Sequence, residues 1–91
     1  MAEIPRRLRA LVYELIDAET ALRSAGRSIA ADSVAFVAKR SNSLAPDEFL
    51  DESRRVLEEA LLGERDLAPE IIASILDIMA MIDEMLQESS R

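Results

Sequence analysis

The segment from Pro69 to Leu86, PEIIASILDIMAMIDEML, constrains the fold of this chain more than any other part of it. Its apolar residues recur every seven positions in three adjacent rows, which merge on a helix into one broad apolar face. The rows are Ala68, Ile75 and Ile82; Ile71, Ile78 and Met85; and Ile72, Met79 and Leu86. The polar positions form a narrow ridge. A helix of this kind is either central in its own domain or shared with another chain.

Three earlier segments also carry helical periodicity, so the sequence predicts four helices. Their expected spans are residues 5–24, 28–40, 46–62 and 69–88. Proline suits the first turn of a helix, and glycine favours its end, which agrees with the positions of the prolines and glycines here. No segment alternates polar and apolar residues over the length of a strand. Short connections favour antiparallel neighbours, so we expect one all-α domain over residues 1–91, a small four-helix bundle.

The predicted fourth helix offers more apolar surface than we expect its neighbours to cover, because the helix at 28–40 is short and rich in alanine. Exposed apolar patches larger than about a few hundred Å² are rare on monomers. We therefore expect a two-fold homodimer, formed through the fourth helix, to complete the bundle. The expected interface residues are Ile71, Ile75, Ile78, Met79, Ile82, Met85 and Leu86. The alternative is that the same residues form the core of a monomer.

The net charge of −7 is distributed unevenly, with +2 on residues 1–45 and −9 on residues 46–91. The acidic half repels phosphate, which disfavours nucleic acid as a partner and a DNA-reading helix-turn-helix at 28–62. The carboxylates expected to form an electrostatic surface are Glu48, Asp51, Glu52, Glu58, Glu59, Glu70, Asp77 and Glu84. Arg6, Arg7 and Arg9 crowd the start of the first helix, where the helix dipole disfavours cations. We expect these arginines to pair with carboxylates of the acidic half.

The residue types exclude several classes of chemistry. The chain has no histidine and no cysteine, which excludes the usual zinc, copper and iron sites and removes the commonest base for a serine nucleophile. Glu70, Asp77 and Glu84 are seven residues apart, about 10 Å along a helix axis, so no two of them hold one ion. We therefore predict no metal and no cofactor. The lack of cysteine, of a secretory signal and of a membrane-length apolar run favours a cytoplasmic location.

These features favour a non-catalytic interaction protein whose acidic surface binds a basic protein, as an antitoxin, an immunity protein or an anti-regulator does. A structural subunit of a larger assembly remains a second interpretation. A third is a small helical enzyme that resembles helical chorismate mutases in composition, although no motif matches residue by residue. That resemblance implies a dianionic substrate held by arginine and lysine. Its candidate residues are Arg9, Arg23, Lys39 and Arg55, with Glu52 or Glu59.

Overall fold

The structure, a computed structural model, describes residues 3–63 and 67–89, and within those ranges it contains four helices and no strand. They are α1 (Glu3–Ser24), α2 (Ser28–Lys39), α3 (Pro46–Gly63) and α4 (Pro69–Ser89). The prediction of an all-α domain with four helices is confirmed, and the predicted ends lie within two residues of the observed ones.

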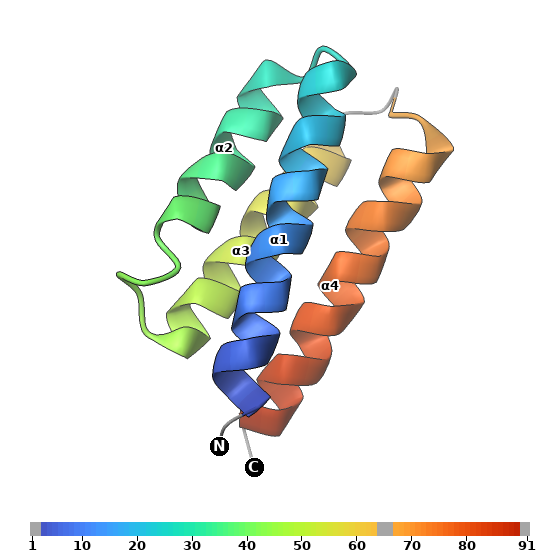
Figure 1. The fold of residues 1–91 in the computed structure, drawn as a ribbon. Helices are drawn as coiled ribbons and strands as arrows, with labels where there is room; N and C mark the ends of the chain where they lie inside the picture. Colours follow the sequence, from blue (N-terminus) through green and yellow to red (C-terminus); the bar gives the residue numbers. More distant parts are fainter. Residues whose placement is uncertain (1–2, 64–66, 90–91) are drawn as a thin grey trace.

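The four helices form a closed ring of antiparallel neighbours (Figure 1). Each helix packs against the next one in the sequence, and α4 packs back against α1. The described chain runs up, down, up and down, so the start of α1 and the end of α4 lie at the same end of the bundle (Figure 1). The principal extents are 39 × 21 × 17 Å. This arrangement leaves two grooves of functional interest, one between α2 and α3 and one between α1 and α4.

The turn between α1 and α2 depends on Gly26. Its φ angle is 80°, in the left-handed region that glycine adopts without strain. The Arg27 amide donates to the carbonyl of Leu22 at 2.9 Å, and the Gly26 amide donates to that of Arg23 at 3.1 Å. These two bonds make a Schellman motif, which ends α1 and sends the chain back as α2. The expectation that a glycine ends the first helix is confirmed.

One hydrophobic core runs through the ring. α2 contributes small side chains, which lets its neighbours approach closely, whereas the other helices contribute larger ones. The largest fully buried side chains are Leu11, Leu15, Leu22, Val34, Val37, Phe49, Leu57, Ile75 and Ile82, together with the polar Ser53. The Oγ atom of Ser53 has no hydrogen-bond partner in the part of the chain that the structure describes. The hydroxyl of Ser53 is therefore buried and unsatisfied within the described residues.

The apolar face of α4 is turned into the bundle. Its central residues Ile75, Ile78, Ile82 and Met85 are buried within the single chain. α1 and α3 flank α4 and cover these four side chains, as expected if they form the core of a monomer; their assignment to an interface between copies stays a prediction. The other three expected interface residues, Ile71, Met79 and Leu86, are only partly buried against the core. Dimerisation through α4 stays a prediction, and it now depends on the outer side of the helix.

No helix within residues 3–63 and 67–89 has the combination of length and apolar character needed to cross a bilayer. Four apolar residues of α4, Ile75, Ile78, Ile82 and Met85, are buried against the rest of the bundle, whereas Leu76 is half exposed.

Candidate functional site

The eight carboxylates predicted to form one electrostatic surface lie on different sides of the bundle. Glu52 and Glu59 of α3 face α2. Glu58 pairs with Arg54 at 3.0 Å, and Arg54 also pairs with Asp83 of α4 at 2.8 Å, so this part of α3 faces α4. These hydrogen bonds, first that to Asp83 and then that to Glu58, raise the pKa of Arg54. Glu84 of α4 lies 4.0 Å from Arg7 of α1, and Glu70 and Asp77 share its face of α4 at seven-residue spacing.

A groove of about 490 Å³ runs between α2 and α3, and we call it the α2–α3 groove. It is lined by Ile29, Asp32, Ser33, Phe36 and Val37 of α2, by Arg40 directly after α2, and by Glu52, Arg55, Val56 and Glu59 of α3. Val37 and Val56 are buried, whereas Ile29 is 84% exposed and Phe36 60% exposed. Leu62, one turn beyond Glu59 on α3, is 75% exposed. An apolar ridge therefore projects into solvent beside a lined hollow.

Carboxylates predominate around the α2–α3 groove. A second hollow adjoins the α2–α3 groove, because Glu52 and Arg55 line both of them. The second hollow is also lined by Glu48 and Asp51. Together they hold five carboxylates and two guanidinium groups, which gives a local charge of −3. We refer to Glu48, Asp51, Glu52 and Glu59 as the acidic rim.

Both arginines of the α2–α3 groove already have partners. Arg55 is paired with Glu52. Arg40 lies over the Phe36 ring, 5.2 Å from its centroid, in a cation–π arrangement. Within the described ranges, no cation pairs with Asp51 or Glu59. Two carboxylates of the acidic rim are therefore available to cations from another molecule.

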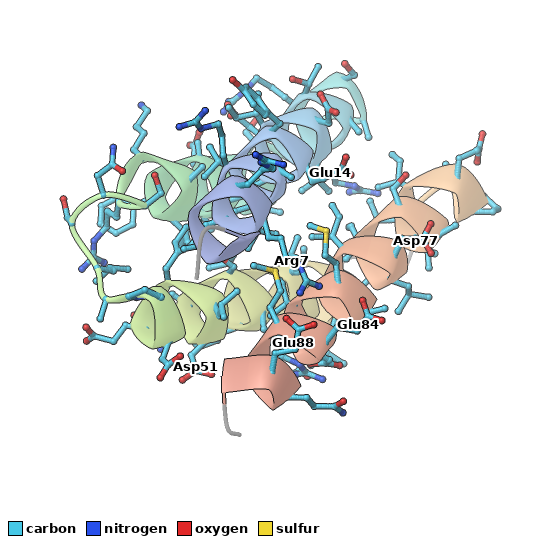
Figure 2. All side chains as sticks on the ribbon, turned by 60° about the horizontal axis from the view of Figure 1, so that its bottom comes forward. Arg7, Glu14, Asp51, Asp77, Glu84 and Glu88 are labelled. Atoms are coloured by element: carbon cyan, nitrogen blue, oxygen red, sulfur yellow. The ribbon has the colours of Figure 1, made fainter. Side chains whose placement is uncertain are left out.

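A second acidic strip follows the α1–α4 side of the bundle. Glu14 and Asp17 of α1 line a small groove of about 140 Å³ whose floor includes Ile75 and Ile78 of α4. The predicted ridge Glu70, Asp77 and Glu84 runs along the neighbouring edge of α4, and Figure 2 shows Glu14, Asp77 and Glu84 on the two helices. The strip has much less exposed apolar surface than the α2–α3 groove, because Ile75 and Ile78 are buried.

Arg7 joins the N-terminal part of α1 to the C-terminal part of α4. Its guanidinium pairs with Glu88 and lies 4.0 Å from Glu84 (Figure 2). The expectation that the first arginines pair with the acidic half is therefore confirmed for Arg7. This ion pair compensates part of the charge at that end of the α1–α4 side.

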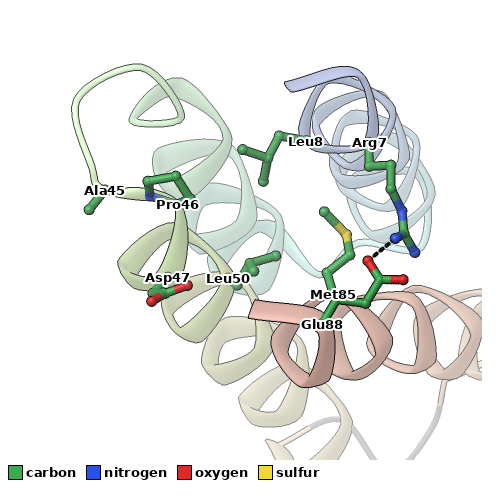
Figure 3. A pocket seen from close by; sticks show the side chains of 8 residues that line it. All are labelled: Arg7, Leu8, Ala45, Pro46, Asp47, Leu50, Met85 and Glu88. Carbon is green, nitrogen blue, oxygen red and sulfur yellow. Dashed lines mark hydrogen bonds and ion pairs between the residues drawn. The ribbon is translucent and has the colours of Figure 1, made fainter. Parts of the chain in front are cut away.

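An apolar hollow of about 280 Å³ lies at the same end of the bundle (Figure 3). Its lining combines Leu8 of α1, Leu50 of α3 and Met85 of α4, and the Arg7–Glu88 pair stands at its edge. Ala45, Pro46 and Asp47 complete it. The hollow has no charged group that is both buried and directed inward, so it gives no basis for assigning a ligand.

The four cations considered for a dianionic substrate do not meet in one site. Arg9 lines a hollow beside Tyr13 on α1, and Arg55 lines the α2–α3 groove. Arg23 is paired with Glu19 at 2.8 Å and with Asp32 at 3.1 Å. Both hydrogen bonds raise the pKa of Arg23, and the bond to Glu19 has the larger effect. The structure therefore offers no single pocket in which these residues could surround a dianion.

No group of three or more carboxylates in the described ranges is arranged to hold a metal ion. Comparison with known proteins adds no assignment, since no family model, no curated protein and no solved structure matches the chain. The α2–α3 groove is therefore the best-supported candidate site, on its exposed apolar residues and its charge.

The sequence prediction missed Ile29 and Phe36 as surface residues, although the pattern contains a signal for them. On α2, the buried residues Ala31, Val34 and Ala38 share one face of the helix. Ile29 and Phe36 are seven residues apart and lie away from that face. Two large apolar side chains at this spacing, opposite a buried face, mark a surface that a partner can cover.

Proposed function

We propose that this chain is a non-catalytic module that binds a basic protein through its acidic surface. The carrying observation is the α2–α3 groove, where Ile29 and Phe36 stand exposed beside the acidic rim. Exposed apolar residues next to charged ones are typical of protein interfaces, in which the apolar centre supplies affinity and charges set the partner and the association rate.

The physical basis is the uncompensated negative charge. Asp51 and Glu59 repel the neighbouring carboxylates of the acidic rim, and this repulsion falls when a cation approaches. A basic partner therefore gains attraction without first having to break an ion pair at these two positions. The protein's overall charge of −7 adds long-range attraction for such a partner.

An antitoxin, an immunity protein or an anti-regulator, each acting in the cytoplasm, would fit this description. The absence of cysteine from the chain supports a reducing compartment. A structural subunit would fit the same surface if its neighbour in the assembly were basic, and the identity of the captured protein distinguishes these cases.

The test is capture of partners by the immobilised protein at two ionic strengths. We expect basic proteins to be retained at about 0.05 M salt and released at about 0.5 M, because the screening length falls severalfold between these conditions. The control bait carries Glu48→Gln, Asp51→Asn and Glu59→Gln, which keeps the shape of the surface and removes three charges. Equal capture by both baits, or capture that does not change with salt, would contradict the proposal.

We also propose, as a second candidate property, that two copies associate through the outer side of α4. Leu76 is 50% exposed there, and Ile72 and Met79 are only partly buried. The change Leu76→Asp is expected to abolish a dimer without unfolding the chain, because this side chain is not part of the buried core. Light scattering would support the dimer by a mass near 20 kDa that falls to the 10.1 kDa of one chain in the variant. A wild-type mass equal to that of one chain would contradict the proposed dimer.

A further inference from the structure

We propose that the α2–α3 groove docks one amphipathic basic helix of the partner protein. This inference rests on the proposed function and specifies its site: apolar residues of the incoming helix pack on Ile29, Phe36 and Val56, and its lysine or arginine residues face the acidic rim. The α1–α4 strip, although also acidic, is not the docking site.

The apolar contacts fit a helix by their spacing. Ile29 and Phe36 are separated by two helical turns, about 10 Å along α2. An incoming helix with leucines seven residues apart presents side chains at the same interval. The whole of α2 is 12 residues long, or about 18 Å, so the contact extends over roughly three turns of the partner. Val37 of α2 and Val56 of α3 are buried and form the floor of the groove.

The charge around the groove selects a basic occupant. The lining and the adjoining hollow carry a local charge of −3, and the arginines on the same surface are engaged with Glu52 and with the Phe36 ring. Asp51 and Glu59 flank the groove from α3 without a cation of their own in the described ranges. An acidic helix would be repelled there, and a purely apolar one would leave both carboxylates without compensation.

The α1–α4 strip has negative charge but lacks the exposed apolar residues that the α2–α3 groove has. Glu14 and Asp17 line a hollow of about 140 Å³ in which Ile75 and Ile78 are already buried by the chain itself. A partner helix placed there would meet charge but would bury little apolar surface. Charge alone steers encounter, whereas the apolar anchors supply most of the affinity.

The test uses a synthetic peptide of about 15 residues with leucines at helical positions i, i+3, i+4 and i+7 and lysines elsewhere. Its binding to the full chain is measured by fluorescence anisotropy, beside an otherwise identical peptide with glutamate in place of lysine. We expect the lysine peptide to bind and the glutamate peptide not to bind. Absence of binding by the lysine peptide would overturn the proposal.

Two matched pairs of variants locate the contact. Phe36→Ala is compared with Tyr13→Ala, since these aromatic side chains are almost equally exposed, at 60% and 62%. We expect Phe36→Ala to weaken Kd by about tenfold, as loss of an apolar anchor does, and Tyr13→Ala by less than about twofold. Equal effects of the two substitutions would overturn the groove as the site.

The second comparison uses two double variants. The first carries Asp51→Lys and Glu59→Lys at the groove, and the second carries Glu70→Lys and Asp77→Lys on α4. Each double change raises the net charge from −7 to −3, so long-range attraction is the same and only the location differs. We expect the first pair to weaken binding by about tenfold more than the second. Equal weakening would overturn the groove but leave the proposal of an acidic interaction protein standing. If neither pair nor added salt weakened binding, both proposals would fail.

A second copy of the chain is the other conceivable occupant, because Arg6, Arg9, Tyr13 and Ile16 form a basic and apolar stripe on the outside of α1. Light scattering distinguishes this case. A wild-type mass near 20 kDa that Phe36→Ala and Tyr13→Ala both reduce to that of one chain would show that α1 of another copy fills the groove, and would overturn the partner helix.

Discussion

Replacement of Ile82 by alanine tests whether the apolar face of α4 is the core of a single chain. Ile82 is fully buried, and α1 and α3 pack on either side of its helix. Truncation of such a side chain removes its transfer free energy and leaves a cavity, at a typical cost of about 2–5 kcal/mol. A domain of this length has a total stability of roughly 5–14 kcal/mol. The substitution is therefore expected to remove a large share of it.

The assay is thermal and urea unfolding followed by circular dichroism at two protein concentrations that differ about a hundredfold. For a domain of this size, a loss of about 3 kcal/mol lowers Tm by roughly 12–24 °C. The control is Leu76→Ala on the same helix, which is half exposed and is expected to cost less than about 1 kcal/mol. Both differences should be independent of concentration, because an intramolecular core does not dissociate.

The reasoning would be refuted if the two substitutions cost the same. It would also be refuted if the destabilisation by Ile82→Ala vanished on dilution of both proteins, since the residue would then stabilise an assembly rather than the chain.

Two further predictions concern single positions. Ser53→Ala is expected to raise the free energy of unfolding by about 1 kcal/mol, because it removes a buried hydroxyl that lacks a partner in the described structure and because alanine has the higher helix propensity. Urea unfolding measures the change. A loss of stability would show that the hydroxyl is satisfied. Gly26→Ala is expected to cost roughly 1–2 kcal/mol through strain at a φ of 80°, whereas Gly63→Ala, where no positive φ applies and nothing lies within 4 Å of the added Cβ, is expected to be neutral or slightly stabilising. Equal effects on Tm would contradict the assignment of the left-handed turn.

The helices could be predicted because their signals are local. Apolar spacing gives the buried face, proline marks the start of α3 and α4, and Gly26 ends α1, and each of these depends only on neighbouring residues. The all-α bundle follows from four such segments joined by short connections.

The environment of α4 could not be predicted in the same way. Whether Ile75 and Ile82 face their own chain or a second copy depends on how closely α1 and α3 approach, which is a property of the whole ring. The width of the apolar face was read correctly, but the capacity of the neighbours to cover it was underestimated. α2 is short, but the burial of α4 does not depend on α2, because α4 lies between α1 and α3.

The candidate site was predicted only in part. The acidic residues of α3 were predicted to form part of an electrostatic surface, but the sequence cannot tell that Glu59 faces α2 while Glu84 faces α1. From the sequence, Ile29 and Phe36 are only two apolar residues of the helix predicted at 28–40. The seven-residue spacing of these two residues is visible in the sequence, but it indicates exposure only once the contacts of α2 with α1 and α3 fix its buried face.

The most direct test of the proposed mode of binding is a titration of the isotopically labelled protein with the leucine–lysine peptide, followed by amide chemical shifts. The account predicts that the largest shifts cluster on residues 29–39 of α2, on Arg40 and on residues 48–59 of α3, with little change near Glu14 and Asp77. Shifts that instead follow the carboxylates on both sides of the bundle, or that concentrate between α1 and α4, would contradict it.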